Sequence, residues 1–311
     1  MEEVRQDPSA LLFAQEQPAW TLSKQMLSGG VAGMLADGVT YPMCTVKSRM
    51  QVQGAQQAAG KVAYAYKGPL DALWTIAARE GWRTLFKGFG TVAQVAPAQA
   101  LYMGAYQASK QFLPGSEESP MTQFAGGVIA TVAQSLAMVP LEVVRQRQQV
   151  QTNTSGAYQG SLDAARTIIR SEGPLALYRG FAMTQMVWGP FNAIYLPMWE
   201  GTKVLAARYT GVGTVDQLDV QWELAASFGS SAVAAAVTNP ADVIKTRLQV
   251  QGRSNIASST NYSGPIDAVK SILRHEGLKG FFRGTMSRVW WVAPSSTIMF
   301  TSYDQLMKAL A

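Results

Sequence analysis

The chain has 311 residues, of which 48% are hydrophobic and 15% are charged, and its formal net charge is +6. A single cysteine excludes an internal disulfide, and a single histidine argues against a histidine-based active site or metal cluster. The lysines and arginines recur in short groups along the chain instead of gathering in one patch, so nucleic acid is not an expected partner.

Residues 1–20 are predicted to be a solvated tail, because they carry four acids against one arginine and match neither a secretory signal nor an arginine-rich transit peptide. The first charge-poor window, residues 25–46, contains only Asp37 as a charged residue. Five further windows contain no charge: residues 89–109, 119–141, 180–199, 224–241 and 289–303. A helix needs about 20 residues to cross the hydrocarbon of a bilayer, so all six windows are predicted membrane spans.

The six windows are rich in glycine, alanine, serine and threonine, which predicts closely packed helices that turn one face toward water. The alternative is a soluble scaffold of helical repeats. Between the two spans of each third of the chain lies an amphipathic stretch that is predicted to be a helix on one membrane face. Its expected apolar face is made by Leu70, Leu73, Trp74 and Ala77, with counterparts at Leu162, Ala165, Ile168 and Ile169 and at Ile266, Val269, Ile272 and Leu273.

A unit of about a hundred residues is repeated three times in the sequence. The main signature of each copy begins with a proline near the end of a charge-poor window. This signature reads Pro42, Cys44, Lys47 and Arg49, then Pro140, Glu142, Arg145 and Arg147, then Pro240, Asp242, Lys245 and Arg247. Two further echoes follow each copy, a Tyr-x-Gly-x-x-Asp segment and a Glu-Gly pair before an aromatic-base-Gly triplet. The repeats are placed at residues 21–115, 116–212 and 213–311. Each proline is expected to kink its helix toward a shared axis, where acid and base face each other across repeats.

The three copies of both signatures resemble the mitochondrial carrier family over residues 23–308. The resemblance implies an all-α membrane protein with six transmembrane helices in three repeats, pseudo-threefold symmetry and three short surface helices. It implies a transporter and not an enzyme, without a cofactor or bound metal. It also implies a monomer in the mitochondrial inner membrane, with both termini on the cytosolic side and cardiolipin as a lipid partner at the surface helices.

In that family a ring of ion pairs closes the matrix side of a central cavity. Carried over, Glu142 pairs with Lys245 and Asp242 pairs with Lys47. Arg145 would face Cys44, so one pair of this matrix gate is expected to be missing; alternatively, Cys44 is simply a small helix residue. The glutamines that support the pairs in the family match Gln51, Gln149 and Gln249.

The resemblance also implies a second ring that closes the cytosolic side. Its residues would be Gln107, Lys110, Glu200, Lys203 and Asp304, with Met307 in the place of the last base. Lys110 can pair with Glu200 and Lys203 with Asp304, whereas Gln107 and Met307 form no charge pair. Both gates are then expected to keep two of three ion pairs, which would leave neither closed state dominant.

Substrate selectivity in the family comes from side chains midway along the even-numbered spans. These positions match Gln94, Val95, Val187, Trp188, Trp291 and Val292. Arg288 and Asp37 are added as candidates, although either could instead be structural. A pocket poor in arginine and rich in tryptophan favours a small solute of low net charge, such as an amino acid or an organic cation. Subgroup similarities to carriers of branched-chain amino acids and of iron leave a metal or cofactor carrier open, and Asp37 leaves a proton-leak carrier open.

Overall fold

A computed structural model describes residues 19–58, 65–112, 120–151, 158–212, 218–252 and 262–310, and this part of the chain is helical without strands. The long helices are α1 (Ala19–Ala58), α3 (Val95–Phe112), α4 (Pro120–Val150), α6 (Phe181–Thr210), α7 (Val220–Val237) continued by α8 (Asn239–Val250), and α10 (Thr285–Leu310). The short helices are α2 (Pro69–Glu80), α5 (Ser161–Glu172) and α9 (Pro265–Glu276). Short 3₁₀ segments join them to the next long helix: two after α2, at Trp82–Phe86 and Phe89–Gln94, and one each after α5 and α9, at Pro174–Tyr178 and Leu278–Phe282.

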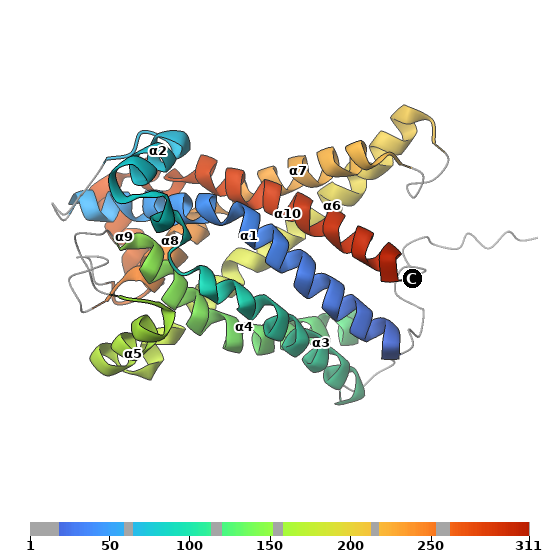
Figure 1. Ribbon diagram of the computed structural model, residues 1–311, viewed down its shortest axis with the longest axis horizontal. Helices are drawn as coiled ribbons and strands as arrows, with labels where there is room; N and C mark the ends of the chain where they lie inside the picture. Colours follow the sequence, from blue (N-terminus) through green and yellow to red (C-terminus); the bar gives the residue numbers. More distant parts are fainter. Residues whose placement is uncertain are drawn as a thin grey trace, which may run out of the picture.

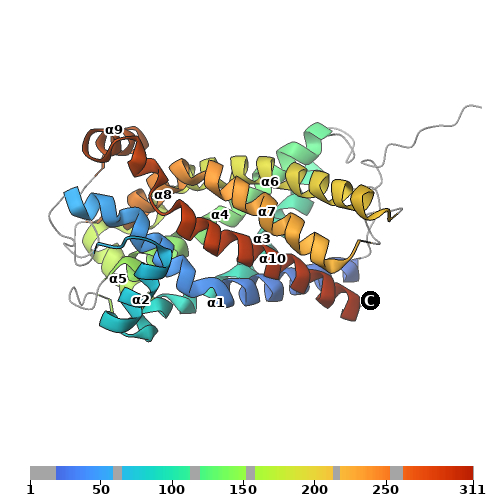
Figure 2. The ribbon, with the colours of Figure 1, turned by 90° about the horizontal axis from the view of Figure 1, so that it is seen from above.

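The long helices run along the longest axis of the molecule and form a closed circuit (Figures 1 and 2). Helix α1 packs against α3 and α10, α3 against α4, and α7 against α6 and α10. The short helices α2, α5 and α9 gather at one end, which we call the surface-helix end, while α1 begins and α10 ends at the opposite end (Figure 1). The expected fold of three repeats, each a long helix, a surface helix and a second long helix, is therefore confirmed.

The three signature prolines act differently in the three repeats. Pro42 and Pro140 lie inside continuous helices, as expected for kinks. Near Pro240 the helix is interrupted instead, because α7 ends at Val237 and α8 begins at Asn239, with the proline in the first turn of α8. A proline fits there, since the first turn of a helix has no internal partner for its N–H groups.

The expected apolar face of the surface helices is buried only in part, since Ile168 and Ile272 are buried while the larger residues of the first turn are exposed. The side chains of Leu70 and Trp74 are 53% and 74% exposed, whereas Ala72 and Ile76 are fully buried under α1. The same pair recurs as Ala164 with Ile168 and as Ala268 with Ile272. An alanine lets the short helix approach the long helix above it, so the isoleucine one turn later fills the space between them. The larger apolar residues point outward, where lipid would meet them.

On length and composition, one described helical segment, Ala125–Val150, is apolar enough to cross a membrane by itself. The other long helices carry more small and polar residues, consistent with a bundle in which one helix face lines a watery interior.

At the glycine of the aromatic-base-Gly signature, the chain that enters the second long helix of one repeat passes close to the first long helix of another repeat. Gly284 has a φ of +76°, and a Cβ added there would lie 3.0 Å from the Gln51 side chain. Gly180 repeats both features against Gln249, with a φ of +80° and the same 3.0 Å distance. Only glycine combines this backbone conformation with so close an approach.

We expect Gly284→Ala to destabilise the protein by about 1–2 kcal/mol, because alanine is strained in the left-handed region. Thermal unfolding of the detergent-solubilised protein measures this as a lower midpoint. Gly104→Ala on α3 is the matched control, since it has open space around its Cα. An equal midpoint for the two variants would contradict the assignment of a special role to Gly284.

Candidate substrate pocket and ion-pair ring

The three signature copies meet at the surface-helix end and form the ion-pair ring, defined here by the pairs Lys47–Asp242, Lys245–Glu142 and Arg145–Asp37. The Nζ atom of Lys47 lies 2.7 Å from Asp242, and the Nζ atom of Lys245 lies 2.6 Å from Glu142. These are the two pairs expected from the sequence. Each joins a base of one repeat to an acid of another, so the ring ties α1, α4 and α8 together.

The third pair uses an acid that the sequence analysis had not connected with the ring. The guanidinium of Arg145 lies 3.4 Å from the carboxylate of Asp37, seven residues before Cys44 on α1. The expectation of a missing pair is therefore wrong for this end of the protein. Cys44 itself is buried and contacts Gln149, with 3.5 Å between its sulfur and the amide nitrogen. The acid that pairs with Arg145 thus stands two helical turns before the expected position on α1. The expected position is held by the buried thiol of Cys44.

The three glutamines lie directly beside the ring. Gln51 donates to Asp242 at 2.7 Å, and Gln249 donates to Glu142 at 3.2 Å. Gln149 has no acid to support and instead accepts from the hydroxyl of Ser48 at 2.9 Å. Buried carboxylates need such donors, because ionic groups removed from water are otherwise costly.

A second layer, which sequence reasoning missed, lies between the ring and the surface helices. Its ion pairs are Arg49–Glu80, Arg147–Glu172 and Arg247–Glu276, each within one repeat. Each arginine also donates to a backbone carbonyl of the next repeat, at Gln149, Gln249 and Gln51 respectively. The side chains of Val52, Val150 and Val250 meet in a small buried cluster at the same level. The sequence signal was the last base of the signature and the Glu-Gly pair, both present three times.

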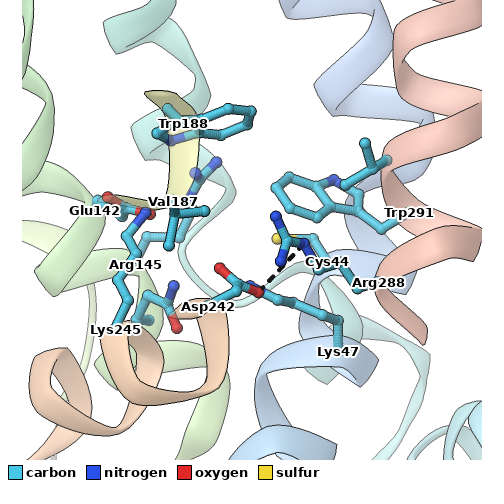
Figure 3. A pocket seen from close by; sticks show the side chains of 12 residues that line it. Cys44, Lys47, Glu142, Arg145, Val187, Trp188, Asp242, Lys245, Arg288 and Trp291 are labelled. Carbon is cyan, nitrogen blue, oxygen red and sulfur yellow. Dashed lines mark hydrogen bonds and ion pairs between the residues drawn. The ribbon is translucent and has the colours of Figure 1, made fainter. Parts of the chain in front are cut away.

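A small pocket lies on the other side of the ring (Figure 3). Trp188 from α6 and Trp291 from α10 flank it, and Val187 and Val292 complete its apolar wall. Its floor is made by Cys44 and by the ring residues Lys47, Glu142, Arg145, Asp242 and Lys245. The ammonium groups of Lys47 and Lys245 lie 5.3 Å and 5.9 Å from the centres of Trp291 and Trp188. An occupant of the pocket would therefore lie beside two tryptophan side chains and beside cations of the ion-pair ring.

Other predicted contact residues are placed differently. Val95 does not line the pocket; a Cβ added at Gly33 of α1 would lie 2.8 Å from it, so it faces that helix. Asp37 is not in the pocket wall either. It pairs instead with Arg145, which does line the pocket. Arg288 does line the pocket, and its Nε atom lies 3.6 Å from Asp242. The side chain of Gln94 lies outside the described residues.

An aromatic ladder on α6 connects the pocket with the opposite end of the molecule. Ring centroids are 5.5 Å apart for Trp188 and Phe191, 5.7 Å for Phe191 and Tyr195, and 6.1 Å for Tyr195 and Trp199. The Nζ atom of Lys203 lies 3.8 Å from the centre of Trp199. Glu200 is exposed to solvent. The side chains of Gln107, Lys110 and Asp304 lie outside the described residues, so the second gate stays a prediction.

The profile of a family described as "Mitochondrial carrier protein" matches residues 19–117, 116–210 and 216–311. The chain belongs to the mitochondrial carrier family. It is 38% identical over 293 residues to "Mitochondrial substrate carrier family protein E" of Dictyostelium discoideum, covering 90% of this chain and 94% of the relative. It is 32% identical to an Arabidopsis thaliana S-adenosylmethionine carrier and 33% identical to human mitoferrin-2, covering 94% and 97% of this chain and 80% and 81% of those relatives. As a member of this family it is a transporter and not an enzyme.

We expect Asp37→Asn to weaken the ring, because it removes the acid that faces Arg145. Asp37 keeps 21% of its side chain exposed, so the loss should be about 1 kcal/mol, roughly fivefold in the population of the closed arrangement. The rate at which a maleimide labels Cys44 measures it, because this sole cysteine is buried beside the ring. Faster labelling is expected in the variant.

Positional rescue makes this test specific. Loss of the pair in Asp37→Asn should also lower the thermal unfolding midpoint. Adding Cys44→Asp to that variant returns an acid to Arg145, and we expect the midpoint to recover. Asp219→Asn is the control, since this exposed residue makes no side-chain cap bond at the start of α7. An Asp37→Asn variant with unchanged labelling, or a double variant that does not recover, would remove Asp37 from the ring.

Proposed function

We propose that this carrier moves a small metabolite of low net charge, an amino acid or a related compound, across the mitochondrial inner membrane by alternating access. The observation that carries the proposal is the position of the pocket, which lies between two tryptophans and directly against the ion-pair ring. A solute seated there would touch the groups that hold the three repeats together. Binding could then offset part of the free energy of opening the ring, which is what alternating access requires.

The chemistry of the pocket supports the substrate class. Each cation of the ring already has an acid as its partner. The pocket wall adds one further base, Arg288, which suits at most one anionic group and not a phosphate group or a dicarboxylate. Two tryptophan faces suit an apolar, aromatic or positively charged side chain. S-adenosylmethionine carriers are among the relatives, and that compound is an amino-acid derivative with both a cationic and an aromatic part.

In this proposal the ion-pair ring is the matrix gate, and the surface-helix end faces the matrix. Both termini then lie on the cytosolic side, and Glu200, Lys203, Lys110 and Asp304 belong to the opposite gate. One copy would form the whole pathway, because the three repeats already close the circuit of helices. The outward apolar residues of α2, α5 and α9 would contact lipid, with cardiolipin as the candidate partner.

A metal carrier is the second candidate, and the 33% identity to mitoferrin-2 favours it. A proton leak is the third, and the carboxylate of Asp37 within α1 favours it. Uptake by proteoliposomes separates the three. The panel contains amino acids, S-adenosylmethionine, adenine nucleotides, ferrous iron and a pH-sensitive dye. Uptake of iron without amino acids, or proton flux without solute uptake, would overturn the proposal.

We expect Trp188→Ala and Trp291→Ala to lower the affinity for the transported solute by roughly 5- to 30-fold, because each removes one aromatic contact. Trp188→Phe is the conservative comparison and should keep most of the affinity. Measurement of uptake half-saturation in liposomes, with the unfolding midpoint as a check on assembly, tests this. Unchanged half-saturation in both alanine variants would place the substrate elsewhere.

A further inference from the structure

Among the bases of the described pocket wall, Arg288 is the one without an acid of its own. Lys47, Lys245 and Arg145 are each paired with an acid of the ring. Arg288 reaches only Asp242, at 3.6 Å, and that carboxylate is already 2.7 Å from Lys47. The pocket wall thus holds four bases and two acids, and Asp37, which pairs with Arg145 from outside the wall, is the third acid. A positive charge in excess inside a low-dielectric site favours an anionic group on the ligand.

Three buried polar atoms in the described pocket wall lack a hydrogen-bond partner. Two are the Nε and Nη1 atoms of Arg288, which is 2% exposed, and the third is the Oε1 atom of Gln146, which is 5% exposed. Buried polar groups are rarely left unpaired, since each costs the desolvation that no partner offsets. The wall therefore offers guanidinium donors on α10 and an amide acceptor on α4.

The amide at position 146 departs from the other two repeats. The corresponding residues are Ser48 and Thr246, whose hydroxyls donate to Gln149 and Gln51 at 2.9 Å and 2.7 Å. In the second repeat no hydroxyl is present, and the Oε1 atom of Gln249 is left without a partner as well. Gln146 thus replaces a residue that would have completed the support of the ring, and it adds an acceptor to the pocket.

The two residues line the same pocket. Arg288 is one helical turn before Trp291 and Val292, which line the same pocket, and Figure 3 shows its guanidinium between Trp291 and Asp242. Gln146 is one turn after Glu142 on α4, and it lines the part of the wall that comes from the second repeat. A guanidinium binds a carboxylate through two parallel hydrogen bonds, and an amide oxygen accepts from an ammonium group.

We propose that Arg288 and Gln146 bind the head group of a zwitterionic amino acid or amino-acid derivative, with the carboxylate on Arg288, the ammonium group on Gln146 and the side chain between Trp188 and Trp291. This assignment rests on the proposed function, and it narrows the substrate class to compounds with both groups on one carbon. A dicarboxylate would find one guanidinium, and an amine without a carboxylate would leave Arg288 unpaired.

Matched ligands test the two contacts separately. Methionine and phenylalanine are each compared with their carboxamide, their decarboxylated amine and their 2-hydroxy acid, as competitors of uptake into proteoliposomes. The wild-type protein is expected to prefer each amino acid over its amide and its amine by roughly 10- to 100-fold, the range for hydrogen bonds to charged groups. In Arg288→Gln this preference for the carboxylate should collapse, and Arg288→Lys should keep part of it.

The ammonium contact is read out independently. In Gln146→Met the preference for an amino acid over its 2-hydroxy acid should fall, while the preference for acid over amide stays. Arg170→Gln on the exposed face of α5 is the control for loss of an arginine. If Arg288→Gln does not assemble, the preference retained by Arg288→Lys decides the question.

Two failures can be told apart. If the wild-type protein takes up amino acids or their derivatives and both substituted proteins keep its ligand preferences, the head-group assignment is wrong and the proposed function stands. If the wild-type protein takes up neither amino acids nor their derivatives, the proposed function is wrong, and the assignment falls with it.

Discussion

Charges that leave water must do so in pairs, and this constraint decides how the three repeats can meet. The side chains of Lys47, Asp242 and Lys245 are at most 5% exposed, and an unpaired ion at that depth costs several kcal/mol. Helices α1, α4 and α8 can therefore approach one another only where each base finds an acid on a neighbouring repeat. When the helices separate, water can hydrate the same groups at little cost, so one set of residues suits both a closed and an open arrangement.

The second layer explains how such an opening could proceed without unfolding the repeats. Arg147 pairs with Glu172 inside its own repeat, whereas its bonds to the carbonyls of Gln249 and Gln251 cross to the next. The ion pair fixes the surface helix to its long helix. The carbonyl contacts and the valine cluster are the bonds that separation would break. Each repeat can thus move as one body, and within this layer separation would break only arginine–carbonyl hydrogen bonds and a small apolar contact.

The repeats allowed the fold and two of the ring pairs to be predicted, because equivalent positions in three copies must occupy equivalent places around one axis. Asp37 could not be assigned in this way. It has no counterpart in the other copies, and its contact with Arg145 depends on how closely α1 and α4 approach. The buried face of the surface helices could be predicted only in part, for a related reason. Helical spacing showed that Leu70 and Trp74 share a face, but lipid accepts apolar residues, so spacing alone could not tell which face is inside.

The departures from threefold symmetry are the informative residues of this chain. A symmetric cavity would present each group three times, which does not suit a solute with a carboxylate at one place, an ammonium group at another and a side chain beyond. Here the acid of the first repeat is displaced to Asp37, the second repeat carries Gln146 in place of a hydroxyl, and the third carries Arg288 below Trp291. The symmetric residues hold the helices together, and the asymmetric ones surround the space where an asymmetric molecule would bind.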